Sequence, residues 1–209
     1  MFEALPDDIS APVTLEYATE SVHQTGRRHL SERQAEVVER LVKAAAAEVE
    51  AHRYSEISVR SIAKRAGVAP ATAYTYFSSK DHLLAEVLWR RVQGSPHLVD
   101  LDAPVPERVA DAVRSMRLGT LDSPAVVSAC TTALLGEGPD VLGVRARLGR
   151  EIAVRLSAAL GPGADPAVLR LLQITYTGAM LSAGLGHLEF DALPSLMAQA
   201  ATLLGASTA

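Results

Sequence analysis

Apolar residues recur along most of the chain at the spacing of one helical face. In the first periodic segment they occupy positions i, i+3, i+4, i+7 and i+11, namely Val38, Leu41, Val42, Ala45 and Val49. This spacing places a single buried stripe along a helix. Strict alternation of apolar and polar residues, which marks a half-buried strand, is absent from every run of four residues between turn signals. The pattern therefore predicts an all-α fold.

Caps, glycines and prolines divide the first half of this pattern into four helices, predicted at residues 31–53, 58–66, 70–77 and 78–93. Ser31 opens a capping-box sequence at the first start, and Ser58 caps the second helix. Gly67 ends the second helix because glycine tolerates a positive φ angle. Pro70 fits the first turn of the third helix, and the Ser-Ser-Lys-Asp sequence at 78–81 caps the fourth.

The remainder of the chain predicts a linker followed by further helices. Residues 94–106 contain glycine and three prolines without helical periodicity, which is typical of a linker. Beyond it, helices are predicted near 105–119, 124–136, 140–160, 166–186 and 191–205. Residues 1–30 lack periodicity and predict a flexible tail. We therefore expect this tail, a first helical domain at 31–93 and a larger helical domain at 94–209.

Residues 58–77 have the sequence shape of a helix-turn-helix, with two short helices joined by a tight turn at Gly67. The small residues Ala63 and Ala66 fall where the two helices must cross closely, and Val68 is placed to fill the corner. The second of the two helices would then be free to enter a DNA major groove.

Charge is distributed unevenly along the chain, whose formal net charge is −4. Residues 1–20 carry five acids and no base, whereas residues 21–93 carry twelve Arg and Lys against eight acids. A basic segment inside an acidic chain is typical of a local site for a polyanion. An ordinary solvated helix surface has the same signature, so charge alone leaves both interpretations open.

Three of the nine aromatic residues, Tyr74, Tyr76 and Phe77, fall in the third predicted helix. A local aromatic core accounts for Phe77. The two tyrosines are two residues apart, so they point ~200° apart around the helix and cannot both be buried on one face. At least one hydroxyl is therefore expected to point outward. Its neighbours would be side chains able to contact phosphate, namely Thr72, Thr75 and Lys80.

The segment 57–84 closely resembles the DNA-binding domain of the TetR family of bacterial transcriptional regulators, with "SVRSIAKRAGV", "TAYTYF" and "SSKDHLL" in order. The resemblance extends over about residues 31–91. It implies an N-terminal three-helix helix-turn-helix domain, including the start of a connecting helix, and a larger C-terminal helical domain for ligand binding and dimerisation. The implied function is a cytoplasmic repressor, although an activator of the same family is also possible.

The resemblance implies DNA contacts for residues of the second, third and fourth helices: Arg60, Thr72, Tyr74, Thr75, Tyr76 and Lys80. Tyr74 matches the family's phosphate-binding tyrosine, and Lys80 its phosphate clamp. Arg27 and Arg28 precede the first helix and would act as a minor-groove or phosphate arm, or else belong to a solvated tail.

Two positions depart from the family pattern. Ala69 stands where a capping residue such as serine is usual, and losing a cap typically costs about 1 kcal/mol. Ala73 is smaller than the leucine often found there, so the base preference of relatives cannot be carried over.

The last two predicted helices look like dimerisation elements. One carries a smooth face and the other a broad apolar face, and the interface residues we expect from them are Gly178, Ser182, Leu193, Leu196, Met197, Ala200 and Leu204. The alternative is that these residues fill the core of a single chain. The family resemblance favours a homodimer, which would read a palindromic operator in double-stranded DNA with half-sites about a helical turn or more apart.

A pocket for a small-molecule effector is expected among residues 105–180, close to the end of the fourth helix. The candidate lining residues are Trp89, Met116, Arg117, Cys130, Leu134, Ile152, Gln173, Tyr176 and Met180, with Leu148, Thr131 and Thr177 as further candidates. For each of them, ordinary core packing is the alternative. Their apolar balance indicates a hydrophobic or amphipathic effector, whose binding would shift the fourth helix near Trp89 and release the operator.

Other functions leave little trace in the sequence. The six histidines show no i, i+4 metal pair, and no nucleophile elbow, phosphate-binding glycine loop or Cys/His cluster occurs. We therefore expect neither enzyme activity nor a metal or cofactor. No apolar stretch approaches the ~18 residues of a membrane helix. A helical carrier of lipids or other small molecules, without DNA binding, remains an alternative that the absence of salt-dependent DNA binding would reveal.

Overall fold

The computed structural model describes residues 32–97, 99–118 and 123–205. Its α-helices are α1 (Glu32–Ala51), α2 (Val59–Arg65), α3 (Pro70–Tyr76), α4 (Lys80–Gly94), α5 (Val105–Leu118), α6 (Pro124–Ala133), α7 (Pro139–Leu160), α8 (Pro166–Gly184) and α9 (Leu193–Leu203). Two 3-10 turns, Tyr54–Glu56 and Phe190–Ala192, complete the described elements. None of this described part is a strand, and the predicted all-α fold is confirmed.

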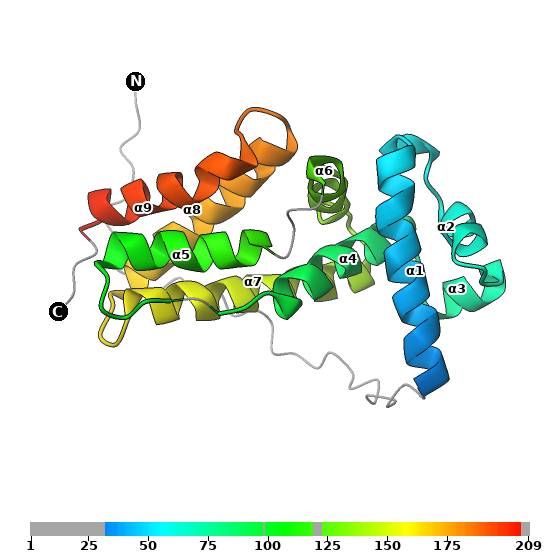
Figure 1. The fold of residues 1–209 in the computed structure, drawn as a ribbon, viewed down its shortest axis with the longest axis horizontal. Coiled ribbons are helices and arrows are strands. Elements are labelled where there is room, and N and C mark those ends of the chain that lie inside the picture. Colours follow the sequence, from blue (N-terminus) through cyan, green and yellow to red (C-terminus); the bar gives the residue numbers. More distant parts are fainter. Residues whose placement is uncertain (1–31, 98, 119–122, 206–209) are drawn as a thin grey trace, which may run out of the picture.

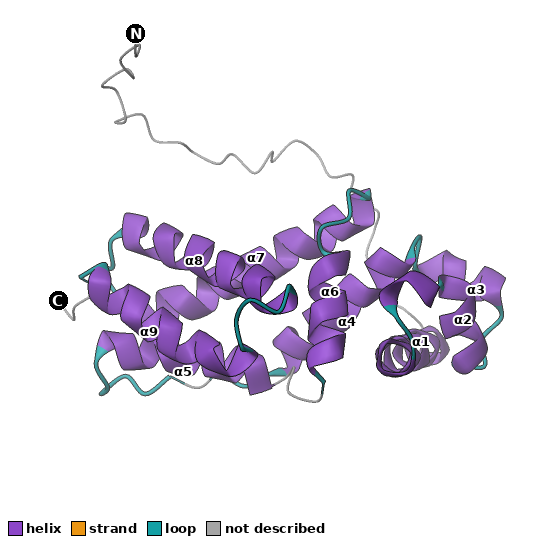
Figure 2. Cartoon of the chain, turned by 90° about the horizontal axis from the view of Figure 1, so that it is seen from above, coloured by secondary structure: helices purple, strands orange, loops and turns teal. Residues whose placement is uncertain are grey.

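The helices form two groups along one elongated molecule (Figure 1). The short helices α2 and α3 pack together against α1 at one end of the molecule, and α5, α7, α8 and α9 form a bundle at the other. Helix α4 runs from the first group into the second, where it contacts α6 and α7, and the view from above in Figure 2 shows the same division. Movement of α4 therefore affects both groups.

Side-chain capping accounts for the starts of α2 and α4, whereas Ala69 at the start of α3 provides no such cap. The Ser58 hydroxyl accepts a hydrogen bond from the Ser61 backbone N–H at 3.0 Å, and the Ser61 hydroxyl accepts one from the Ser58 N–H at the same distance. Ser79 caps α4 in the same manner by accepting from the His82 N–H at 3.0 Å. Gly67 adopts a φ of 63°, as its predicted role in ending α2 requires. The predicted roles of Ser58, Ser79 and Gly67 at the helix ends are thus confirmed.

Several predicted boundaries were wrong by a few residues. Helices α6 and α8 end at Ala133 and Gly184 rather than near 136 and 186, whereas α5 is described as far as Leu118 and its predicted end near 119 lies outside the described residues. The predicted helix 191–205 is instead a 3-10 turn followed by α9, because Pro194 fits only the first turn of the α-helix. The 3-10 turn after α1 was not predicted. The expected tail (1–30), its Arg27 and Arg28, and the Ser31 cap lie outside the described residues.

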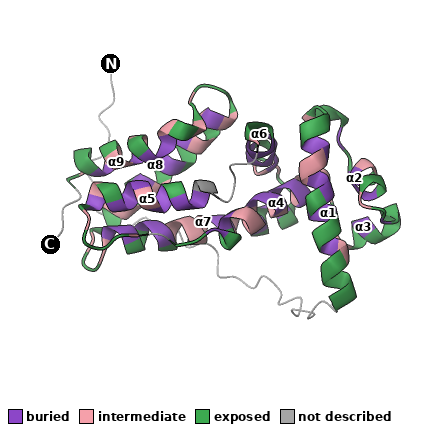
Figure 3. Cartoon of the chain, in the orientation of Figure 1, coloured by how far each residue is buried: buried purple, intermediate pink, exposed green. Residues whose placement is uncertain are grey.

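One hydrophobic core extends through both groups of helices. The whole apolar stripe of α1 is buried, as predicted, and it packs against α4. Figure 3 shows that buried residues follow α4 along its length, and five of these are Leu83, Leu84, Val87, Leu88 and Val92. Within the described residues, no helix is long and apolar enough to cross a membrane.

Candidate functional site

The turn between α2 and α3 brings these helices together in the arrangement expected of a helix-turn-helix. The Val68 N–H donates to the Ala63 carbonyl at 2.9 Å, which folds the chain sharply after Gly67. Ala63 and Ala73 are completely buried at the contact, and Val68 fills the corner as predicted. Because Ala73 and Phe77 anchor α3 to the core, the opposite face of this helix points away from the molecule.

The outward face of α3 carries the predicted hydroxyl groups. Tyr74 is 52% exposed, whereas Tyr76 is partly buried against the core, so the prediction that the two tyrosines point in different directions is confirmed. Thr72 and Thr75 are also exposed, and the Thr75 hydroxyl donates to the Ala71 carbonyl at 3.1 Å. The exposed part of α3 thus offers two threonine hydroxyls and one phenol to a polar partner.

The two predicted cations lie in different surroundings. Arg60 is exposed near the start of α2. The Lys80 ammonium donates to the Tyr54 carbonyl at 2.8 Å and lies 4.2 Å from the centroid of the Tyr54 ring. An ammonium has three N–H donors, so Lys80 keeps donors for a further contact while the 3-10 turn holds it in place. Nothing in the sequence pattern indicated this Lys80–Tyr54 pair.

Tyr54 is held from the other side by Asp81. Its hydroxyl donates to Asp81 Oδ1 at 2.5 Å, and burial together with this carboxylate raises the pKa of Tyr54 well above its usual value. Tyr54, Lys80 and Asp81 therefore connect the turn after α1 to the start of α4.

A cavity of about 380 Å³ lies in the bundle and is lined by residues from α4 to α9. Eight of its lining residues were predicted: Met116, Thr131, Leu134, Leu148, Ile152, Tyr176, Thr177 and Met180. The others are Leu88, Val92, Val113, Leu135, Arg145, Gly149, Leu181, Phe190 and Leu193. The predicted pocket location, close to the end of the fourth helix, matches this cavity, since Leu88 and Val92 lie near the end of α4.

Three other predicted lining residues lie elsewhere. Trp89, Cys130 and Gln173 do not line the cavity, and the side chain of Arg117 lies outside the described part of the chain. Cys130 is completely buried, and burial raises the pKa of its thiol to about 12. The thiol therefore stays protonated near neutral pH, in keeping with an unreactive packing residue.

Trp89 belongs to a charged cluster on another side of α4. The Arg147 guanidinium lies 5.1 Å from the Trp89 ring centroid and donates to Glu86 Oε2 at 2.6 Å. Arg90 in turn bonds to Glu86 at 3.1 Å and to Glu39 of α1 at 3.3 Å. These contacts link α7, α4 and α1, which sequence spacing could not reveal because the partners are up to 61 residues apart.

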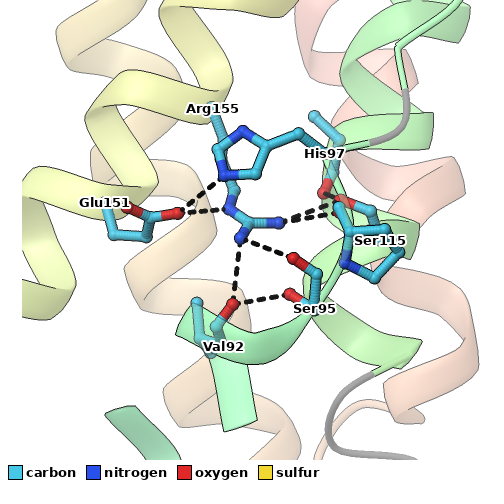
Figure 4. A network of polar contacts seen from close by, with 8 residues as sticks. Val92, Ser95, His97, Ser115, Glu151 and Arg155 are labelled. Atoms are coloured by element: carbon cyan, nitrogen blue, oxygen red, sulfur yellow. Dashed lines mark hydrogen bonds and ion pairs between the residues drawn. The ribbon is translucent and has the colours of Figure 1, made fainter. Parts of the chain in front are cut away.

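A second buried network fixes the end of α4 (Figure 4). Arg155 of α7 is 2% exposed, and its Nη2 donates to the carbonyls of Val92 at 2.9 Å and Ser95 at 3.1 Å. Its Nε donates to Glu151 Oε1 at 2.7 Å, and this carboxylate also lies 3.1 Å from His97. Arg155 therefore satisfies carbonyls that the end of a helix leaves without partners.

The residues predicted for a dimer interface are divided between core and surface. Leu193 and Met197 are buried in the core of the single chain, while Ser182, Leu196, Ala200 and Leu204 are partly buried and Gly178 is exposed. Apolar side chains that the sequence analysis did not select are more exposed, with Ile174 at 62% and Leu203 at 88%. Leu171, Ile174, Leu181 and Leu185 share one side of α8 and its end by helical spacing, and we call them, with Leu203 of the neighbouring α9, the α8–α9 apolar face.

Comparison with known proteins identifies relatives across most of the chain. The profile of bacterial regulatory proteins of the tetR family matches residues 41–87. An uncharacterized HTH-type transcriptional regulator of Mycobacterium tuberculosis (strain ATCC 25618 / H37Rv) is 43% identical over 160 residues, covering 76% of this chain and 75% of that protein. A regulator of Mycobacterium bovis has the same identity and coverage.

Solved structures share the fold over a similar length. A TetR transcriptional regulator from Rhodococcus sp. RHA1 is 28% identical, covers 86% of this chain and 100% of its own, and superposes with a TM-score of 0.64. BioQ, solved with its double-stranded DNA operator, is 18% identical and shares the fold with a TM-score of 0.54 over 81% of this chain and 98% of its own. The chain therefore belongs to the TetR family of bacterial regulatory proteins and is a helix-turn-helix transcriptional regulator rather than an enzyme.

Proposed function

We propose that this protein is a ligand-responsive repressor that binds a palindromic operator as a dimer and is released by a small hydrophobic or amphipathic effector. The observation that carries the proposal is the outward face of α3, which presents Thr72, Tyr74 and Thr75 beside a turn closed at Gly67. A helix held in this way can enter the major groove with its hydroxyls against phosphates and base edges. Such a regulator acts on the chromosome, so we place it in the bacterial cytoplasm.

In this proposal the DNA-binding residues have distinct tasks. Arg60 and Lys80 neutralise phosphates on either side of α3, and Arg27 and Arg28 extend the contact as an arm. Tyr74 bonds to phosphate, while the remaining predicted residues, Thr72, Thr75 and Tyr76, read the groove. We retain the division at residues 31–93 and 94–209, with α4 shared mechanically by both domains.

We assign dimerisation to the α8–α9 apolar face. Ile174, Gly178, Leu181 and Leu185 follow one another at helical spacing on α8, and Leu203 extends the surface from α9. Exposed apolar patches of this kind are uncommon on monomers and mark interaction surfaces. Pairing two copies here would present two α3 helices to one side of a duplex, which doubles the bases read.

Effector binding would act on operator affinity through α4. Leu88 and Val92 place α4 in the cavity wall, so a ligand that prefers another position of α4 changes the separation of the two α3 helices. A ligand shifts such an equilibrium only by its differential affinity for the two conformations, and a shift from 1:99 to 99:1 requires about a 10⁴-fold difference.

Selection from a random duplex library followed by gel retardation tests the proposed function. We expect the purified full-length protein to enrich a palindrome and its binding constant K to fall steeply as the salt concentration rises. The slope of log K against log salt should become less negative by about 0.9 for each phosphate contact removed. Arg60→Gln should change the slope in this direction by about this amount. Arg150→Gln, which removes an exposed charge from α7, should not change it.

Two outcomes would contradict the proposal. A protein that enriches no duplex sequence, or whose binding is independent of salt, would instead fit the alternative of a helical carrier. A protein that binds an operator but increases transcription from it would be an activator of the same family.

A further inference from the structure

Among the described residues that line the effector cavity, Arg145 alone carries a charge. It is exposed, so it lies where the cavity meets solvent. Its Nη2 donates to the Gly136 carbonyl at 2.9 Å, and no carboxylate of the described residues forms an ion pair with it. A guanidinium has five N–H donors, which leaves Arg145 able to bind an anion at the cavity mouth.

The interior of the cavity is largely apolar. Twelve of its lining residues are Leu, Val, Ile, Met or Phe, and none is acidic. One polar lining atom, the buried Thr131 hydroxyl oxygen, lacks a hydrogen-bond partner among the described residues. The volume of about 380 Å³ holds a body of roughly a dozen non-hydrogen atoms, since a water-sized group fills ~30 Å³ of liquid.

We propose that the effector is an amphipathic acid with an apolar body of about ten carbons and one anionic group bound by Arg145. This inference rests on the proposed function, because it assigns a chemical class to the effector of that same cavity. An apolar wall without acids favours burial of the body, and the unpaired guanidinium selects a carboxylate or a similar anion over a neutral or cationic group.

The same arginine connects the cavity to the DNA-binding domain. Gly136, in the loop between α6 and α7, lies against the start of α4, since a Cβ on it would be 3.2 Å from Asp81 Oδ2. Asp81 holds Tyr54, whose carbonyl accepts from Lys80. An anion that draws Arg145 from the Gly136 carbonyl would loosen this loop beside the start of α4, which adds a second route to the coupling through Leu88 and Val92.

Calorimetry on the full-length protein with three probes of equal chain length tests the inference. We expect sodium decanoate to bind at least tenfold more tightly than 1-decanol, and decylammonium more weakly than either. Arg145→Gln should abolish the preference for decanoate and leave the affinity for 1-decanol within about twofold. Arg145→Lys should keep part of the preference, and Arg150→Gln, five residues further along α7 and not among the residues lining the cavity, should keep all of it.

Decanoate binding no tighter than 1-decanol, no binding of decanoate, or an undiminished preference in a folded Arg145→Gln variant would overturn the inference. Operator retardation without ligand separates this failure from failure of the proposed function. If the protein binds its operator but does not discriminate between the headgroups, only the effector class is wrong. If it binds no operator, the regulator assignment itself fails.

Discussion

His82 lies between the recognition helix and the ligand-binding domain. Its ring packs edge-on against Phe77 with centroids 5.2 Å apart, and its Nδ1 lies 3.5 Å from the Ser78 hydroxyl and 3.8 Å from Asp140 Oδ2 at the start of α7. Burial lowers the pKa of His82, while the charge of Asp140 opposes that shift. The neutral imidazole is therefore favoured in the folded protein.

This pKa shift predicts a loss of stability in mild acid. The unfolded chain binds the His82 proton more readily, so this contribution is fully present above pH ~6.5 and is lost as the pH falls through and below that value. Between pH 7.5 and 5.5, the melting temperature of the wild type should fall more steeply than that of His82→Gln. Thermal unfolding at fixed ionic strength measures this, and parallel curves for both proteins would contradict it.

Gly67 provides a second prediction at the residue scale, because only its backbone conformation restricts substitution. A Cβ there would meet no atom within 4 Å, but φ is 63°. Gly67→Ala should therefore destabilise the protein by about 1–2 kcal/mol through strain alone. Gly143→Ala, equally free of contacts but inside α7, should stabilise it by up to about 1 kcal/mol. Urea unfolding measures the free energy of unfolding of both variants. Equal effects of the two substitutions would contradict the prediction.

At the scale of an element, α4 is fixed at both ends by side chains from distant parts of the chain. Tyr54 and Asp81 hold its start, and Arg155 holds its end through the carbonyls of Val92 and Ser95. These contacts at both ends restrict bending of α4, the helix that lines the cavity and also connects to the recognition helix α3.

Removing the Arg155 guanidinium should free the end of α4 from its hydrogen bonds to α7. Arg155→Met removes the donors to the Ser95 and Pro96 carbonyls and leaves Glu151 with only His97 as a partner, so we expect a loss of about 3–5 kcal/mol in the free energy of unfolding. Arg150→Met, on the exposed side of the same helix, should change it by less than about 0.5 kcal/mol. A loss below 1 kcal/mol for Arg155→Met would show that α4 is held by packing alone.

At the scale of the whole molecule, the α8–α9 apolar face predicts the oligomeric state. Ile174→Asp places a charge in the middle of this face and should convert the proposed dimer into a folded monomer with at least tenfold weaker operator binding. Leu101→Asp, which exposes a similar charge in the segment between α4 and α5, should leave the dimer intact. Sedimentation velocity measures the oligomeric state of both variants. An Ile174→Asp variant that remains a dimer would show that the interface lies elsewhere.

The sequence by itself determined the helices and the helix-turn-helix, because these depend on neighbours within a few residues. The caps at Ser58 and Ser79, the positive φ of Gly67 and the buried stripe of α1 all follow from local hydrogen bonds and helical spacing. The spacing of Tyr74 and Tyr76 on a single short helix likewise required that at least one of them point outward, and the structure shows that it is Tyr74.

Only the tertiary structure decided which neighbour each helical face meets. Leu193 and Met197 occupy the core of their own chain. Trp89 faces Arg147 and does not line the cavity, whereas Arg145 does. Periodicity shows that a face is apolar, but its partner depends on how all the helices pack at once. Contacts between residues some 60 positions apart, such as that of Arg155 with Val92, leave no local trace in the sequence.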